Sequence, residues 1–166
     1  MGNNQNSHQL MNGSHFEFDV KSISDSEIAD EYLKRFTLNA GDQLTSADDV
    51  VLHLRPCFSD DLYREKFVCI FLNGRNQVIA TEILFEGSLT TSAVYPREVI
   101  RRVLHHGAAA VLFCHNHPSS NPNPSQDDLT ITKKLVEAAN TIDVTVHDHI
   151  IIAGTEYTSF AERGLI

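Results

Sequence analysis

The feature that most constrains the fold is an apolar run, Ala108–Cys114, that ends directly at His115-Asn-His117-Pro118. A short, continuous apolar run is typical of a strand buried on both faces, so other elements must cover it above and below. Pro118 ends the strand, and the segment 118–124, rich in Pro, Ser and Asn, predicts a loop. We therefore expect layers built around a central strand whose end carries two histidines.

Hydrophobic periodicity predicts further strands and helices around this central strand. Phe67–Leu72 and Val78–Phe85 are strand-like, and Asn73-Gly74 between them favours a β-hairpin. Helices are expected from Ser24 to Phe36, from a cap formed by Thr45 and Asp48 to just before Pro56, and from Pro96 to about His106, where Gly107 closes the helix. Ser125 is expected to open a further helix. A strand over Val144–Ala153 and a short segment Tyr157–Phe160 complete the expected elements.

These elements predict an α/β (α+β) fold in which helices flank a mixed β-sheet. The expected domain spans residues 42–166. A disordered tail over 1–22 and an N-terminal helix and linker over 23–41 are expected to precede it, because the first residues are polar and lack an apolar period.

The overall composition narrows the class of protein. No stretch is apolar for long enough to span a membrane and no secretory signal is visible, so the cytoplasm is the expected location. The formal charge of −9 argues against a nucleic-acid-binding surface. Arg97, Arg101 and Arg102 form the nearest basic cluster, and a solvated helix face is expected for them. The three widely spaced cysteines predict neither a disulfide framework nor a thiolate zinc cage.

His115 and His117 are the first candidate metal ligands. Side chains at i and i+2 of a strand share one face, so both imidazoles project into one site while Asn116 points away. Asp128 follows in the first turn of the helix that Ser125 opens. Two imidazoles and a carboxylate suit Zn²⁺ and leave a fourth position for water, which predicts a metal-dependent hydrolase. Solvated histidines and a plain helix cap fit the same residues.

The spacing of these residues resembles a known motif. His115-x-His117-Pro118, six further residues and Ser125-x-x-Asp128 resemble the JAMM metalloprotease motif of the MPN fold. The RadC family is a closer resemblance, carried by His-Asn-His-Pro-Ser at 115–119, Pro-Ser-x-x-Asp at 124–128, Tyr-Pro-Arg-Glu at 95–98, Asp-His at 148–149 and Phe-Ala-Glu-Arg-Gly at 160–164. The resemblance runs from about Leu44 to Ile166. Ser120 departs from the family's usual Gly, and the family's N-terminal helix-hairpin-helix region is not visible.

The RadC resemblance implies an MPN/JAMM architecture, which is similar to that of cytidine deaminases, and a single zinc ion. His115, His117 and Asp128 are the implied ligands, and the Ser125 hydroxyl is the implied donor to the oxyanion. The implied reaction is attack of a zinc-activated water on the carbonyl of a peptide or isopeptide bond in a peptide or protein substrate.

JAMM enzymes also use an upstream glutamate as general base and acid. Glu65, just before the strand Phe67–Leu72, matches its place in the order of elements. Glu82 in the next strand is the alternative.

The remaining histidines are expected to serve other purposes. His147 and His149 are expected to share one strand face, but no suitably placed third ligand follows them. Because Asp148-His149 recurs in RadC-like sequences, we expect this pair to support the metal ligands from behind or to pack. His53, His105 and His106 are expected to be ordinary polar positions on helices.

Other functions compete with the hydrolase. A non-catalytic MPN scaffold usually lacks some of the ligands, whereas this chain keeps all of them. The RadC name is associated with DNA repair, which no residue here supports directly. The nuclease class named after His-Asn-His disperses those residues along its fold, and a zinc deaminase requires a Pro-Cys-x-x-Cys that does not follow.

Overall fold

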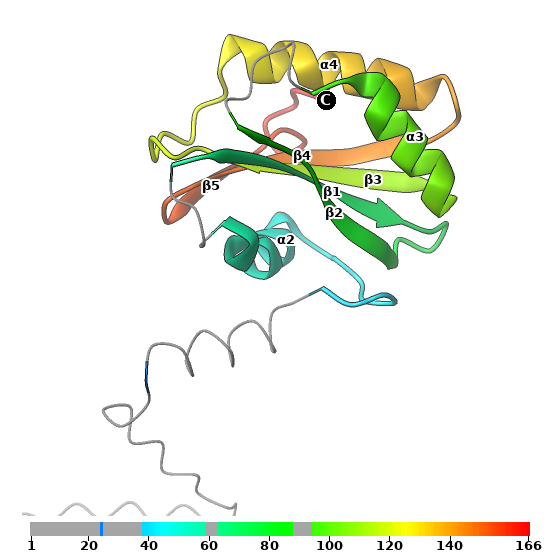
Figure 1. The fold of residues 1–166 in the computed structure, drawn as a ribbon, viewed down its shortest axis with the longest axis horizontal. Coiled ribbons are helices and arrows are strands. Elements are labelled where there is room, and N and C mark those ends of the chain that lie inside the picture. The colour runs from blue at the N-terminus through cyan, green and yellow to red at the C-terminus, as the bar shows by residue number, and fades with distance from the viewer. Residues whose placement is uncertain (1–23, 25–37, 59–62, 88–93) are drawn as a thin grey trace, which may run out of the picture.

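The computed structural model describes residue 24 and residues 38–58, 63–87 and 94–166. These residues form a mixed five-stranded sheet between helices, which confirms the predicted fold class (Figure 1). The elements in chain order are α2 (Ala47–Leu54), the 3-10 helix η1 (Arg55–Phe58), β1 (Glu65–Leu72), β2 (Val78–Gly87), α3 (Pro96–His106), β3 (Ala110–Asn116), α4 (Gln126–Asn140), β4 (Thr145–Ala153) and β5 (Glu156–Ser159). Apart from Ser24, the expected tail and the helix to Phe36 lie outside the described residues.

The central strand of the sheet is β3, as its apolar run predicts. The strand order is β2-β1-β3-β4-β5, and β3 pairs antiparallel with β1 and parallel with β4. All residues of β3 are buried. Helix α4 makes the crossover that a parallel β3–β4 pair requires. The end of β3 and the start of α4 are therefore adjacent in the chain and in space.

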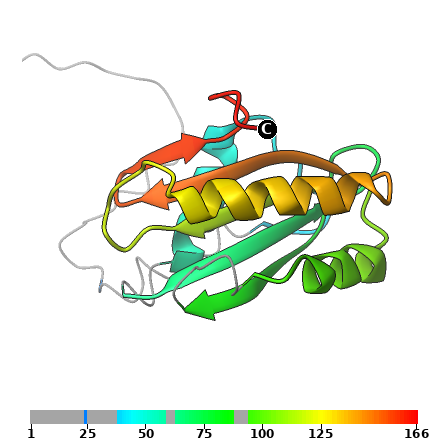
Figure 2. The same cartoon turned by 90° about the horizontal axis from the view of Figure 1, so that it is seen from above.

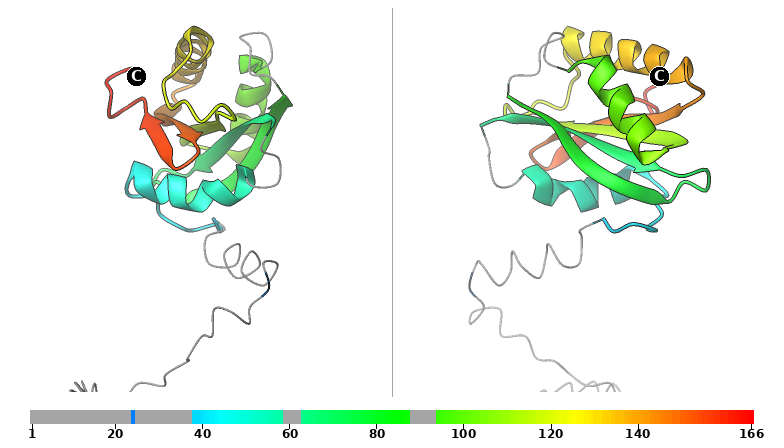
Figure 3. Two further views of the ribbon diagram at one scale, coloured as in Figure 1. Left: turned by 90° about the vertical axis from the view of Figure 1, so that its left-hand side faces the viewer. Right: turned by 45° about the vertical axis from the view of Figure 1, so that its right-hand side comes forward.

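Helices cover both faces of the sheet. Helices α3 and α4 lie on one face and α2 lies on the other, with the sheet between them (Figures 2 and 3). The α3/α4 face buries Phe67, Cys69, Phe71, Val111, Phe113, Ile131 and Leu135. The α2 face buries Val50, Val51, Leu54, Val68, Ile70, Leu112 and Cys114. Alternate residues of β1 and β3 supply the two cores, because successive strand side chains point to opposite faces.

The predicted hairpin and the predicted ends of α3 are confirmed. In the β1–β2 turn, Asn73 Oδ1 accepts hydrogen bonds from the backbone N–H groups of Arg75 (2.8 Å) and Gln77 (3.1 Å). Helix α3 begins at Pro96 and ends at His106, and its C-cap Gly107 has a φ of 60°, the left-handed conformation that glycine adopts without strain.

The predicted cap of α2 is wrong by one residue. Ser46, not Thr45, is the N-cap, and its side chain accepts a hydrogen bond from the Asp49 N–H at 3.1 Å. The sequence carries the capping pattern in two overlapping registers, Thr45 with Asp48 and Ser46 with Asp49. The chain uses the second register, and the Thr45 hydroxyl donates to the Asp49 carboxylate at 2.5 Å.

The two histidines of β4 lie on opposite faces, so the expectation that they share one is wrong. The β3–β4 register shifts between Val111 and Leu112, which pairs Leu112 with Asp148 and leaves His147 as an extra residue. His147 contacts Asn76 Oδ1 through Nε2 at 2.8 Å, whereas His149 packs among aromatic rings on the α3/α4 face.

None of the helices in the described ranges combines the length and the hydrophobicity that a bilayer span requires.

Candidate metal centre

The end of β3 brings two imidazoles together. His115 is fully buried, and its Nε2 lies 3.0 Å from Nε2 of His117, the residue that follows the strand. The predicted convergence of the two side chains is therefore what the structure shows. The side chain of His117 remains slightly exposed (12%), so the pair opens towards the surface at His117.

The first turn of α4 adds a carboxylate to this pair. Asp128 is buried, and its Oδ1 lies 3.3 Å from His115 Nε2 while its Oδ2 lies 3.3 Å from His117 Nε2. Ligand atoms about 2.0–2.1 Å from a tetrahedral ion are separated by about 3.3 Å. The donor atoms therefore already have the spacing that such an ion requires, and these three residues could hold a metal ion.

Burial and contacts among the side chains set the charges of the three candidate ligands. Burial raises the pKa of Asp128, but its close contacts with the imidazoles of His115 and His117 outweigh it and hold this pKa well below its usual range. Burial lowers the pKa of His115. Burial also lowers the pKa of His117, but its bond with Asp128 outweighs this effect and the net shift is upward. An ionised Asp128 and a neutral His115 are the protonation states that bind a metal ion.

The other ring nitrogen of each ligand imidazole also has a partner. His117 Nδ1 lies 2.7 Å from the Asn121 carbonyl oxygen, and His115 Nδ1 lies 2.8 Å from His149 Nε2. A carbonyl oxygen can only accept, so Nδ1 of His117 carries a proton, and Nε2 is the nitrogen that could coordinate a metal ion. His149 is thus close enough to support the ligands from behind, and it also packs on Phe160 with ring centroids 4.8 Å apart.

Ser125 is the N-cap of α4 and also contacts the side chain of Asp128, the candidate metal ligand. Its Oγ accepts a hydrogen bond from the Asp128 N–H (3.1 Å) and donates one to Asp128 Oδ2 (2.6 Å), and its own N–H donates to Oδ2 (2.7 Å). Ser125-x-x-Asp128 therefore forms the helix cap that its pattern predicts. The same Asp128 carboxylate also faces the two imidazoles, so the cap and the candidate metal site share this residue.

Glu65 begins strand β1 on the face that carries the candidate ligands. Phe67 pairs with His115, and directly opposed residues of antiparallel strands share a face, so Glu65, two residues before Phe67, lies on that face too. Burial and Asp128 have the larger effects on the pKa values of His115 and His117, and the charge of Glu65 also raises both pKa values. Glu65 is thus within electrostatic reach of both imidazoles.

Asn116 holds the backbone on both sides of Glu65. Its Oδ1 accepts a hydrogen bond from the Lys66 N–H (2.7 Å), and its Nδ2 donates to the Arg64 carbonyl (3.0 Å). The carboxamide has the same donor and acceptor pair as a peptide group, so it continues the β1–β3 ladder where the backbone pairing ends. The strand spacing predicts only that Asn116 points away from the imidazoles, and it carries no signal of this contact.

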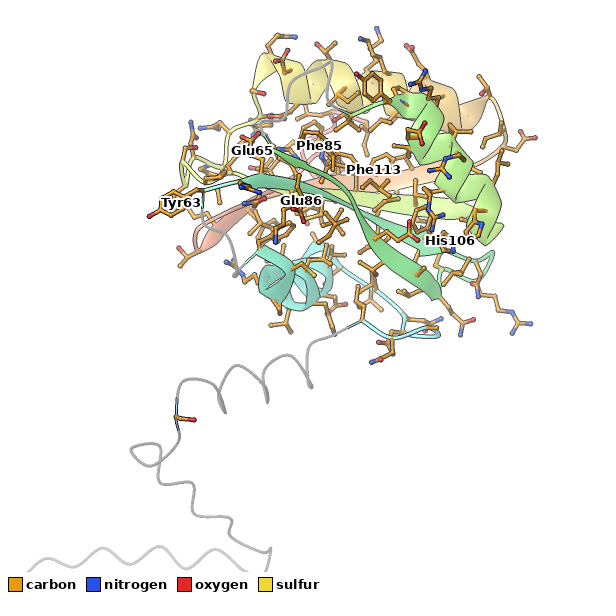
Figure 4. The ribbon with its side chains drawn as sticks, viewed as in Figure 1. Tyr63, Glu65, Phe85, Glu86, His106 and Phe113 are labelled. Carbon is orange, nitrogen blue, oxygen red and sulfur yellow. The ribbon has the colours of Figure 1, made fainter. Side chains whose placement is uncertain are left out.

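The alternative glutamate, Glu82, lies in a different cluster. It bonds to Arg102 Nε (2.6 Å) and Nη2 and to His106 Nε2 (2.9 Å). The bond with Arg102 is the largest cause that lowers the pKa of Glu82 to about 2. Glu65 and His106 lie at opposite ends of the sheet (Figure 4). Of the two candidates, Glu65 is the one at the end of β1 that pairs with the end of β3 carrying the imidazoles.

The cluster around Glu82 also corrects two expectations for α3. Arg102 and His106 were expected to be solvated or ordinary polar positions, but their side chains are only 25% and 15% exposed. They lie on the side of α3 that faces β2, where Glu82 supplies a partner. The exposed face expected for Arg97 and Arg101 is confirmed, since their side chains are 80% and 67% exposed.

The chain matches the RadC-like JAB domain family over residues 44–165. The chain belongs to this family. The predicted RadC resemblance is thereby confirmed. Among curated relatives, a UPF0758 protein of Vibrio campbellii is 46% identical over 140 residues, covering 84% of this chain and 62% of the relative. A UPF0758 protein of Thiobacillus denitrificans is 50% identical over 127 residues, covering 76% of this chain and 56% of the relative.

The RadC-like chain therefore spans about six tenths of the length of these relatives. Their names state no activity. Ser120, where the family commonly has Gly, has a φ of 58° in this RadC-like domain. A left-handed backbone is the conformation that glycine adopts at least cost, which explains why glycine suits this position.

Proposed function

We propose that this RadC-like domain is a zinc-dependent hydrolase of the JAMM type that cleaves a peptide or isopeptide bond. The observation that carries the proposal is the convergence of His115, His117 and Asp128 at the spacing of a tetrahedral site. Glu65 lies on the same face of the sheet, which supplies a titratable group for proton transfer.

The donor set determines which chemistry the site supports. Two imidazoles and one carboxylate suit zinc and leave a fourth position open, as in catalytic sites. Bound there, zinc would lower the pKa of a water molecule and polarise a substrate carbonyl. Phe67, Val94 and Ile131 line the inner side of the site next to His115 and Asp128, and such apolar walls strengthen electrostatic interactions within it.

Glu65 is the proposed general base and acid. In this role its carboxylate accepts a proton from the attacking water and then delivers that proton to the leaving amine. Asn116 contributes by fixing the backbone before and after Glu65, so that the carboxylate stays on the ligand face of the sheet.

Ser125 is the proposed donor to the substrate oxygen. The Asp128 N–H holds the Ser125 oxygen in place, and the hydroxyl proton points at Asp128 Oδ2. Only the O–H rotor has to turn for the proton to reach a carbonyl oxygen that develops negative charge. Such a donor accelerates acyl transfer by about 10²–10³-fold.

Cleavage of a peptide library, followed by mass spectrometry, tests this proposal. The zinc-loaded chain should cleave a subset of peptides, and a chelator should abolish the cleavage. Glu65→Gln should abolish turnover while zinc binding is retained, and Glu82→Gln, the matched control in the separate cluster with Arg102 and His106, should keep turnover. Zinc binding without cleavage of any peptide, including isopeptide-linked ones, would favour a non-catalytic scaffold.

A further inference from the structure

We infer that His149 and Thr132 orient His115 for metal binding through a chain of hydrogen bonds that ends at Asp128. The inference rests on the proposed metal centre and adds two positioning residues to it. His115 Nδ1 lies 2.8 Å from His149 Nε2, and His149 Nδ1 lies 2.6 Å from Thr132 Oγ1. Thr132 Oγ1 in turn lies 2.6 Å from the Asp128 carbonyl oxygen, to which it donates.

The directions of these hydrogen bonds follow from the two ends of the chain. The Asp128 carbonyl can only accept, so the Thr132 hydroxyl donates to it and accepts from His149 Nδ1. His149 is then protonated on Nδ1 and accepts at Nε2, which requires the proton of His115 to be on Nδ1. The remaining nitrogen of His115, Nε2, therefore presents a lone pair, and this is the atom that faces His117 and Asp128.

Burial makes this arrangement specific. His115, His149 and Thr132 are each at most 1% exposed, so no solvent competes for their polar atoms. The His149 ring stacks on Phe160 at 4.8 Å and meets Phe67 edge-on at 5.5 Å, which fixes its orientation. Along this series of hydrogen bonds every donor meets an acceptor. A buried imidazole that lost its hydrogen-bond partner would destabilise the folded protein.

The chain of bonds also ties together the elements that supply the ligands. His115 is on β3, His149 is on the neighbouring strand β4, and Thr132 is on α4, one turn after Asp128. The inference explains why a buried histidine and a buried threonine face each other across β4 and α4. Partners of this kind typically contribute about 10–100-fold to the metal affinity of the ligand that they hold.

Zinc affinity, measured by competition with a chromophoric chelator, tests the inference without a substrate. Thr132→Val keeps the size of the side chain but removes the acceptor for His149, so the His149 proton is free to move to Nε2 and to disturb His115. We expect Thr132→Val to weaken zinc binding by about 10–100-fold. Thr132→Ser, which restores the hydroxyl, should recover most of the affinity.

Two controls separate this role from simple packing. His147→Gln changes the neighbouring histidine on the opposite face of β4 and should leave zinc affinity unchanged. Thermal unfolding of the metal-free variants should show that Thr132→Val is folded. Equal zinc affinity in Thr132→Val and in the unmutated chain would overturn the inference alone. Failure of the unmutated chain to bind zinc would overturn the proposed function and the inference together.

Discussion

Ser125 has two contacts that should each contribute to the free energy of unfolding: it caps α4, and it donates a hydrogen bond to Asp128, the candidate metal ligand. Ser125→Ala removes both. Loss of an N-cap costs about 1 kcal/mol of unfolding free energy. Ser125 also donates a 2.6 Å hydrogen bond to the buried Asp128 carboxylate, and bonds to charged groups contribute about 1.5–3 kcal/mol. The expected loss of unfolding free energy is therefore about 2.5–4 kcal/mol.

Ser46→Ala is the matched control, because Ser46 caps α2 through one hydrogen bond to Asp49 and lies away from the metal centre. It should lose only the cap contribution of about 1 kcal/mol. Urea unfolding of both variants, in the presence of a chelator, gives the two free energies without a contribution from metal binding.

Activity distinguishes the variants further. Ser125→Ala should lower kcat by about 10²–10³-fold, whereas Ser46→Ala should leave it unchanged. If Ser125→Ala cost no more stability than Ser46→Ala and kept full activity, both the hydrogen bond to Asp128 and the proposed donor role of Ser125 would be refuted.

Two further predictions concern stability. Glu82→Gln should lower the free energy of unfolding by about 1 kcal/mol at pH 7, a value reduced for the partial exposure of the pair. Since the pKa of Glu82 is lowered from 4.5 to about 2, its stabilisation is complete above pH 4.5 and disappears as the pH falls towards 2. Urea unfolding should therefore show the two proteins converging in that range; a constant difference would count against the ion pair. Ser120→Gly should raise stability by about 0.5–1 kcal/mol, because Ser120 has a φ of 58°. Asn76→Gly, at the same φ, should gain less because Asn tolerates this conformation, and an equal gain at both positions would contradict the reasoning.

The sequence was most informative where local patterns set the structure. The apolar run before His115 predicted the central strand, and the i, i+2 spacing predicted that His115 and His117 converge. Pro96 and Gly107 predicted the ends of α3. Each of these predictions depends on backbone conformation and strand periodicity over a few residues, which neighbouring sequence determines.

Contacts between distant segments escaped prediction. The Asn116 carboxamide contacts backbone some 50 residues away, and nothing in its neighbours signals this. The extra residue at His147 reverses the side-chain alternation of β4 before His149, so periodicity alone assigned both histidines to one face. Arg102 and Glu82 meet only because α3 packs on β2. Such features depend on tertiary packing and on strand register.

Metal content is the most direct test of the account. The chain, purified without chelators and analysed by inductively coupled plasma mass spectrometry, should contain one zinc ion per molecule. His117→Ala should lose it, because it removes one of three converging donors, and His147→Ala, which changes a histidine outside the centre, should retain it. Absence of stoichiometric metal from the unmutated chain, or its full retention in His117→Ala, would contradict the account.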